Sequence, residues 1–154
     1  MSFEAVKAYF EKAGIADRIQ VFHESTASVQ DAAEQLGVKP EQIGKTMAFN
    51  LKEGPIVIVV KGTARISNQK FKAAFHQKAK MVQAPDLPER IGHPAGGVCP
   101  FALQPGVRVY LDESVKDEAD LYPAAGLPNA ALRLSLAELQ QYSEPFEWTD
   151  VVKD

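Results

Sequence analysis

Apolar side chains recur at helical spacing in several segments of the chain. Phe3, Val6 and Phe10 are three or four positions apart and are followed by Gly14, a pattern typical of an amphipathic helix over residues 2–13. Three further helices are predicted to begin directly after a serine that caps the first turn, and a fourth, short one contains a proline near its start. These further ranges are 29–36, 68–75, 86–91 and 136–142.

Continuous and alternating apolar runs predict the strands. Two runs flank Lys52-Glu53-Gly54 and predict a hairpin, and the second contains five consecutive β-branched residues, 56–60. Such a run is typical of a central strand that is buried on both faces. The expected strands are 19–23, 45–51, 55–61, 80–83, 107–111, 119–123 and 131–134.

The order of these elements predicts the fold class. Strands outnumber helices and interleave with them irregularly, so we expect an α+β fold in one domain over residues 1–154, with a mixed sheet that closes on itself. Residues 143–154 are expected to form a tail, with Phe146 and Trp148 docked on the core.

One segment fits no regular element. Gly92–Phe101 holds three glycines, two prolines, a histidine and the only cysteine. Proline lacks an amide hydrogen, and adjacent glycines allow positive φ and a close approach to the main chain. The segment is therefore either a shaped loop that presents backbone groups to a ligand or an ordinary turn between two strands, and composition leaves both open.

Composition narrows the class of protein. The 154 residues are 45% hydrophobic and 24% charged, which suits an ordinary globular domain with one core. No apolar run approaches the length of a membrane span, and the N-terminus begins an amphipathic pattern instead of a secretion signal, so we expect a cytoplasmic protein with no membrane partner. One cysteine and three scattered histidines match no disulfide or zinc spacing, so no metal or other cofactor is expected.

The net charge of −3 conceals an uneven distribution. Residues 55–84 contain no Asp or Glu, whereas ten acidic residues lie between Asp112 and Asp154. A basic block in an acidic protein suits contact with phosphates on one face, and the alternative is a solvated face whose lysines bind nothing. The cations of this block are Lys61, Arg65, Lys70, Lys72, Lys78 and Lys80.

Candidate catalytic side chains are few. The chain has no G-x-S-x-G motif, no P-loop and no dinucleotide fingerprint. Cys99 with His93 as its base is conceivable, but no orienting acid is evident, and a lone cysteine is usually a packed residue. His23, at the end of a predicted strand, is better explained by packing. Lys45 begins an apolar strand after Gly44. Its cation lies either at the mouth of a cavity enclosed by the sheet or in solvent at the end of the strand, and spacing leaves both open.

Together these segments resemble the YbaK family, which is similar to the editing domain inserted in bacterial prolyl-tRNA synthetases. The resemblance runs in order from about residue 20 to residue 140. It is carried by Ala32-Ala33 through Leu36-Gly37, Ile43-Gly44-Lys45-Thr46-Met47, the apolar strand before Lys61-Gly62, Gly96-Gly97-Val98-Cys99-Pro100-Phe101, Asp112-Glu113-Ser114, Ala125-Gly126 and Leu134-Ser135-Leu136-Ala137-Glu138-Leu139.

The resemblance implies a strongly curved, barrel-like mixed sheet surrounded by helices. It also implies trans-editing, the hydrolysis of the ester that joins a wrong amino acid to a tRNA, with no protein nucleophile or metal. Lys45 would bind the substrate end, while the loop from Gly96 through Gly97 to Pro100 surrounds the scissile ester and helps to place a water. Main-chain donors suit this task because they need no reorganisation as charge develops.

The implied partner is the acceptor end of a mischarged tRNA, and an aminoacyl-tRNA synthetase is left open as a second partner. No DNA partner is implied. Further substrate contacts are expected from His23, Thr46, Val98, Cys99, Pro100 and Asp112, and tRNA contacts from Lys61, Arg65, Lys70 and Lys72.

Two positions depart from the family pattern. Cys99 stands where many relatives have serine, and Ala102 stands where a glycine is common. Both positions abut the expected pocket, so the choice of substrate is not carried over from the family. We rank alanine or cysteine on proline tRNA first because small amino acids are the family's usual targets. Editing is needed because a hydrophobic synthetase pocket separates near-isosteres by only about 1–3 kcal/mol. The alternatives are a non-catalytic module that binds an acceptor end or a small aminoacyl ligand, and cysteine chemistry at Cys99.

Overall fold

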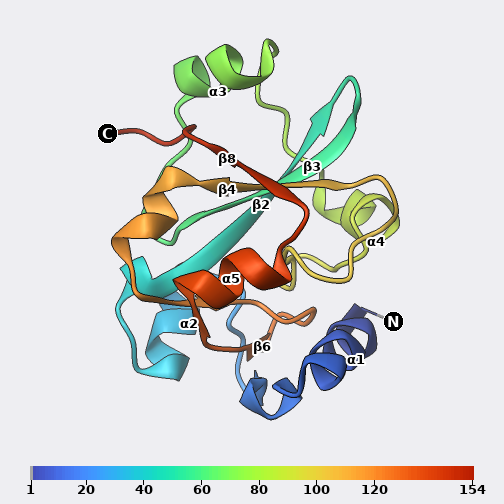
Figure 1. The fold of residues 1–154 in the computed structure, drawn as a ribbon, viewed down its shortest axis with the longest axis vertical. Helices are drawn as coiled ribbons and strands as arrows, with labels where there is room; N and C mark the ends of the chain where they lie inside the picture. Colours follow the sequence, from blue (N-terminus) through green and yellow to red (C-terminus); the bar gives the residue numbers. More distant parts are fainter. Residues whose placement is uncertain (1) are drawn as a thin grey trace.

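The computed structural model describes residues 2–154 and is built on a six-stranded mixed sheet that curls into a half-barrel with helices around it (Figure 1). The strand order is β7-β5-β2-β3-β4-β8. A two-stranded sheet pairs β1 (Gln20–Val21) with β6 (Ala130–Ala131). The main strands are β2 (Ile43–Leu51), β3 (Gly54–Lys61), β4 (Arg108–Asp112), β5 (Asp120–Pro123), β7 (Leu134–Ser135) and β8 (Phe146–Thr149). This confirms the predicted α+β class and the mixed, curved sheet.

The helices lie where the apolar periodicity predicts them. In Figure 1, α3 lies at one end of the molecule and α1 at the other, with α5 lying across the sheet between them. The α-helices are α1 (Ser2–Ala13), α2 (Val29–Leu36), α3 (Asn68–Phe75), α4 (Leu87–Arg90) and α5 (Leu136–Tyr142), and the 3₁₀ turns are η1 (Ala16–Arg18), η2 (Pro40–Gln42), η3 (Ala84–Asp86) and η4 (Glu113–Asp117). None of the helices within residues 2–154 is long and apolar enough to cross a membrane.

Serine hydroxyls fix the starts of three helices. Ser28 Oγ accepts the amide of Asp31 at 3.0 Å, and Ser67 Oγ accepts the amide of Lys70 at 3.2 Å. Ser135 forms a full capping box with Glu138 at the start of α5. Each cap satisfies an amide that has no partner inside its helix, which contributes about 1 kcal/mol.

β3 is the central strand, as its β-branched run predicts. It pairs antiparallel with β2 and parallel with β4, and the side chains of 56–60 are all 0% exposed. Because successive side chains point to opposite faces, Val59 packs with Leu111 in one core cluster, whereas Ile58 packs with Phe71 of α3 in another. The sheet is therefore covered on both faces.

Four strand predictions need correction. Residues 80–83 form no strand, and only a bridge from Met81 to Phe49 joins them to β2. The expected strand 131–134 is divided between β6 and β7, and β1 keeps only two of the residues 19–23. Residues 143–154 are more than a tail, because β8 extends the sheet by pairing parallel with β4. These pairings join segments far apart in the sequence, so local propensity does not reveal them.

Candidate functional site

A cavity of about 280 Å³ opens beside β2 where β2 loses its partner strand. β2 pairs with β5 only at Ile43 and Gly44, and residues 80–82 bond to the same edge only from Ala48 onward, so the edge between these two contacts faces the cavity. The opposite walls come from the start of α2, the glycine-rich loop and the segment that precedes α4. The volume is just below the roughly 300–1,000 Å³ of typical ligand pockets, so the cavity suits a small group. The residues of the walls are Thr26–Val29, Ala32, Ile43–Ala48, Met81, Val82, Leu87, Ala95, Gly96, Val98, Tyr122, Ala124 and Ala131.

Thr46 presents polar atoms at this open edge. In an antiparallel ladder, every second residue of β2 bonds to β3, and the residues between them direct their amide and carbonyl away from β3. Ala48 and Asn50 are of this second kind: the carbonyl of Ala48 accepts from Val82, and the amide of Asn50 donates to Lys80. The same alternation turns the amide and carbonyl of Thr46 outward, toward the cavity. Its Oγ1 is buried and has no hydrogen-bond partner within residues 2–154. Buried polar groups are nearly always paired, so Thr46 is a strong candidate for contact with a ligand.

Lys45 supplies a cation next to Thr46. Its side chain is half-buried, and Nζ donates to the carbonyl of Ala64 at 2.7 Å. Burial lowers the pKa of Lys45 because it disfavours the ammonium, and the nearby charge of Arg65 lowers it further. An ammonium has three donors, so two remain for a ligand beside the one that holds the side chain in place.

The glycine-rich loop reaches the cavity through Gly96 and Val98 and is packed tightly from behind. Gly96 has φ +81°, and a Cβ there would lie 2.8 Å from the Cβ of Ala27. A Cβ on Gly97 would lie 2.7 Å from the carbonyl carbon of Gly126. The amide of Gly97 donates to Pro94 at 2.9 Å, and its carbonyl accepts the amide of Gly126 at 3.1 Å. The loop is therefore held in position by Gly97, which packs directly against the main chain of Gly126 with no side chain between them.

Behind that contact, Ser2 and His93 brace the loop. Ser2 Oγ lies 2.5 Å from Nδ1 of His93 and 3.0 Å from the carbonyl of Gly126, and Nε2 of His93 donates to the carbonyl of Phe101 at 2.6 Å. Burial lowers the pKa of His93, which favours the neutral ring. Because Nε2 carries the ring hydrogen, Nδ1 is an acceptor, and the single hydroxyl hydrogen of Ser2 is shared between Nδ1 and the carbonyl of Gly126. Helix α1 is thereby tied to both glycine-containing loops.

Replacing Ser2 by alanine is expected to leave Nδ1 of the buried His93 without a partner. An unsatisfied buried polar atom costs about 1–3 kcal/mol, so the melting temperature should fall by roughly 2–4 °C for each kcal/mol in a chain of this size. The turnover number for the ester hydrolysis that the family resemblance implies should fall too, because the loop loses its brace. Ser135→Ala, which removes the cap of α5, should destabilise to a similar degree and leave turnover unchanged. Equal turnover in Ser2→Ala and wild type would show that the brace does not position the loop.

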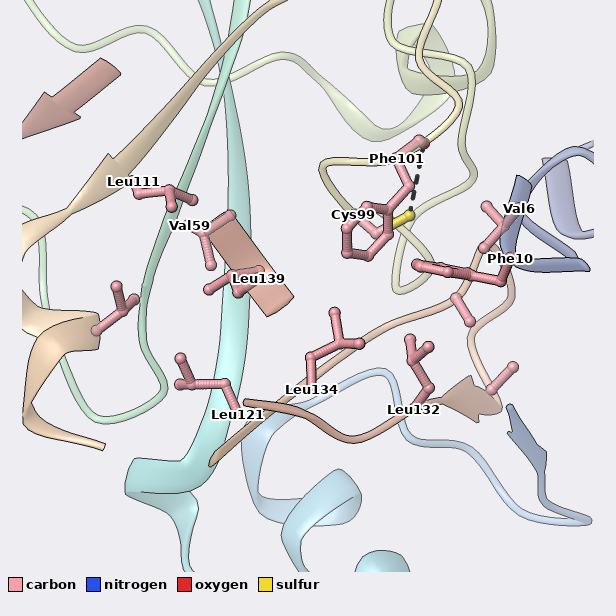
Figure 2. Close-up of a cluster of buried hydrophobic side chains, with 13 residues drawn as sticks. Val6, Phe10, Val59, Cys99, Phe101, Leu111, Leu121, Leu132, Leu134 and Leu139 are labelled. Carbon is pink, nitrogen blue, oxygen red and sulfur yellow. Dashed lines mark hydrogen bonds between the residues drawn. The ribbon is translucent and has the colours of Figure 1, made fainter. Parts of the chain in front are cut away.

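Cys99 belongs to the core and not to the cavity. It is 0% exposed, and its sulfur points among the apolar side chains of the cluster that includes Val6, Phe10 and Phe101 (Figure 2). Sγ lies 3.8 Å from the carbonyl of Phe101 and 3.4 Å from Nε2 of His93. Burial raises the pKa of the thiol to about 12, so it stays protonated at neutral pH. A protonated, inaccessible thiol is inert as a nucleophile.

Two measurements check this placement of Cys99. In the ester hydrolysis that the family resemblance implies, Cys99→Ser is expected to keep at least about half of the wild-type turnover, because the smaller hydroxyl still fits beside His93. In the native protein the thiol should also resist alkylation and react only on unfolding, since only the thiolate attacks. Rapid alkylation of the folded protein with loss of activity would contradict both expectations.

The structure brings only part of the predicted substrate-contact set together. Lys45, Thr46, Gly96 and Val98 line the cavity, whereas Gly97 packs behind the loop. Pro100 faces a groove on the other side of the loop beside Tyr9 and Tyr142, and His23 is exposed beyond the end of β1.

Asp112 also lies away from the cavity. Its carboxylate is 0% exposed and accepts the amides of Ser114 at 2.9 Å and Val151 at 2.8 Å. It therefore caps η4 and ties the C-terminal segment to β4, and both oxygens are already used. We retain neither Asp112 nor Cys99 as a substrate contact, since neither side chain reaches the cavity.

The four cations predicted to contact tRNA differ in their surroundings. Lys61 pairs with Asp117 at 2.9 Å, and Lys70 pairs with Asp150 at 3.2 Å and Asp154 at 2.8 Å. These bonds raise the pKa of both lysines. Arg65 and Lys72 are exposed and form no ion pair within residues 2–154. Of these four cations, Arg65 beside Lys45 and Lys72 on α3 are therefore the two available to an anionic ligand.

Several parts of the site were not predicted from sequence. The wall formed by Thr26–Ser28, the wall at Met81–Val82 and the brace by Ser2 carry no recognisable motif. The small side chains at Ala27, Ala32 and Ala124 leave the space that forms the cavity, but alanine is too common to signal this. Among residues 2–154, no three His, Cys, Asp or Glu side chains gather as a metal site would require.

Comparisons with known proteins find related sequences. The family model described as the aminoacyl-tRNA editing domain matches residues 23–142. The uncharacterized protein YwhH of Bacillus subtilis (strain 168) is 36% identical over 155 residues, covering 100% of this chain and 99% of the relative. The proline–tRNA ligase of Kosmotoga olearia is 31% identical over 90 residues, which is 58% of this chain and only 16% of the ligase.

Solved structures match the fold over its whole length. The crystal structure of a proposed trans-editing enzyme for prolyl-tRNA synthetase superposes with a TM-score of 0.88, covering 99% of this chain and 98% of that one. The two are 23% identical, so the likeness speaks for the fold alone.

Proposed function

The chain belongs to the family of aminoacyl-tRNA editing domains, and on that premise we propose that it is a free-standing deacylase that hydrolyses the ester of a mischarged tRNA. The observation that carries this proposal is the cavity in which Lys45, the edge of β2 and the Gly96–Val98 loop converge. YwhH is matched over 99% of its length, which leaves no room in that relative for an attached synthetase. This supports action in trans.

In this proposal the terminal ribose of the tRNA enters beside Lys45. The ammonium, fixed by its bond to Ala64, offers its remaining donors to the ribose or its phosphate. The amide, carbonyl and hydroxyl of Thr46 line the path of the aminoacyl group along the open edge of β2. Substrate is therefore positioned by a strand that cannot move independently of the sheet.

The loop then acts on the ester. Gly97 uses its amide and carbonyl to hold the loop against Pro94 and Gly126, and the residues on either side of it, Gly96 and Val98, line the cavity and supply main-chain groups to it in this proposal. These groups orient a water toward the carbonyl carbon and bind the oxygen as charge develops. The water oxygen forms a bond to the carbonyl carbon, the bond to the ribose oxygen breaks, and a proton from the water passes to the leaving ribose oxygen. A hydroxyl of the substrate assists this transfer, so no protein nucleophile is needed.

The cavity favours a small amino acid. Alanines at 27, 32, 48, 95, 124 and 131 and glycines at 44 and 96 form much of its wall, and about 280 Å³ must accommodate the aminoacyl group with part of the ribose. We rank alanine and cysteine, carried on proline tRNA, as the first substrates.

A deacylation panel tests the proposal. Purified protein is incubated with tRNAs carrying alanine, cysteine, serine or threonine, and the remaining aminoacyl-tRNA is followed with time. Loss of the alanyl or cysteinyl ester well above its spontaneous rate is expected. Salt-dependent tRNA binding with no turnover on any of the four would overturn the proposal and favour a non-catalytic binding module.

A further inference from the structure

We propose, on the basis of the function proposed above, that the single-stranded acceptor end of the tRNA leaves the cavity along residues 78–82, the segment that covers the edge of β2 at Ala48 and Asn50, and that Lys72 and Lys78 bind its phosphates. The two lysines lie in a hollow outside the cavity, on α3 and in the segment that follows it. This assigns the RNA path to one side of α3 and removes Lys61 and Lys70 from it.

The hollow is concave, polar and positively charged. Lys72, Lys78, Asn68, Gln69 and Ala79 line a depression of about 460 Å³. Both lysines are exposed, and neither forms an ion pair within the part of the chain that the structure describes. Two ammonium groups with amide side chains between them suit the oxygens of a phosphate backbone.

Helix α3 separates two kinds of lysine. Asn68 and Lys72 are four positions apart, so they share one side of the helix, while Lys70 points to the other side, about 200° away. On that other side, Lys70 is held by Asp150 and Asp154 in the C-terminal segment. A cation already paired with two carboxylates adds little attraction for RNA, whereas the charge of Lys72 is not offset in this way.

The hollow and the cavity lie at the two ends of one short segment. Lys78 and Ala79 line the hollow, whereas Met81 and Val82 line the cavity. Ala79 packs in the same apolar cluster as Met47 and Ala64. Met47 also lines the cavity, and the carbonyl of Ala64 holds Lys45. A nucleic-acid strand that follows this segment from the ribose site therefore passes Met81 to reach Lys78.

Exposed groups fill the interval between the two sites. Met81 lies on the cavity wall and is 53% exposed, one of two large hydrophobic side chains so exposed among the described residues. Lys80 beside it is exposed as well. The exposed thioether of Met81 next to the cation of Lys80 suits a single strand of RNA whose bases stack on apolar surfaces while its phosphates contact lysines.

The charge along this route is uniformly positive. Residues 55–84 contain no acidic residue. At the tip of the hairpin, Glu53 accepts a hydrogen bond from Gln77. Lys72, Lys78 and Lys80 provide three exposed cations along the route, so we expect about three phosphate contacts and a salt slope of log affinity of roughly −2 on a single strand.

The test compares two substrates with matched variants. Lys72→Ala/Lys78→Ala is expected to raise KM for a mischarged full-length tRNA by roughly tenfold with little change in turnover. The same double variant should hydrolyse an aminoacyl-adenosine, which has no upstream phosphates, at the wild-type rate. Lys70→Ala, on the same helix, should behave as wild type with both substrates.

Binding of uncharged proline tRNA separates this inference from the proposed function. The double variant should bind it more weakly and with a salt slope smaller by about 1.4, since two contacts are lost. That readout stands even if no ester is hydrolysed. Wild-type tRNA affinity in the double variant, or an equal loss of affinity in Lys70→Ala, would overturn the proposed path.

Discussion

Replacing Lys45 by alanine is expected to lower the rate of ester hydrolysis by at least about tenfold, the scale of one lost charge-assisted contact. The ammonium lies in a half-buried position, and its bond of 2.7 Å to Ala64 fixes its direction. Such a group does not reorganise when substrate binds, so its loss should affect the transition state as well as the ground state. The measurement is the single-turnover rate of deacylation with enzyme in excess.

Two further variants separate charge from packing. Lys45→Met keeps the apolar stem of the side chain and removes the ammonium, so it should be as slow as Lys45→Ala. Lys12→Ala removes an exposed lysine of α1 that does not line the cavity, and it should retain the wild-type rate. A fully active Lys45→Met variant would show that the cation is not needed.

A larger loss, about a hundredfold in the single-turnover rate, is expected for Gly97→Ala. The added Cβ would lie 2.7 Å from both the carbonyl carbon of Gly126 and the amide nitrogen of Leu127. Both are main-chain atoms and cannot rotate away, so the two loops must separate and Gly96 and Val98 move with them. Displacing a positioned group by about 1 Å can cost two orders of magnitude in rate.

The control for Gly97→Ala is a glycine with free space around it. Gly106 has φ +88°, and no atom lies within 4 Å of the position that a Cβ would take there, so Gly106→Ala strains the backbone without a collision. It should lower the melting temperature and leave deacylation unchanged. Circular dichroism must show that Gly97→Ala is folded. A folded Gly97→Ala protein with the wild-type rate would contradict a catalytic role for the position of the loop.

Local chemistry explains which elements can be predicted correctly from sequence. Serine caps and glycine stops act within one turn, so the starts of α2, α3 and α5 and the ends of α1 and α2 follow directly from neighbouring residues. The β-branched run of β3 likewise indicates its own burial. The local sequence of β8 predicts only a tail, because its pairing with β4 depends on residues almost 40 positions away.

The same division holds for the site. Composition and spacing leave both Lys45 and the Gly96–Val98 loop open, and the resemblance to the YbaK family is what singles them out as site residues. The structure places both at the cavity. The brace by Ser2 could not be predicted, because it exists only when α1, His93 and Gly126 meet in three dimensions. Cys99 and Asp112 show the converse: both are chemically conspicuous, but burial and existing hydrogen bonds commit them to the core and to the C-terminal segment.

Whether the loop and Lys45 together hydrolyse an aminoacyl ester can be decided by a single time course. Proline tRNA charged with alanine is mixed with excess wild-type protein, and free alanine is measured against a sample without protein and against proline tRNA charged with proline. We expect rapid release of alanine while the prolyl ester persists. Decay of the alanyl ester at only its spontaneous rate, in a protein that binds the tRNA, would show that the site does not catalyse this reaction.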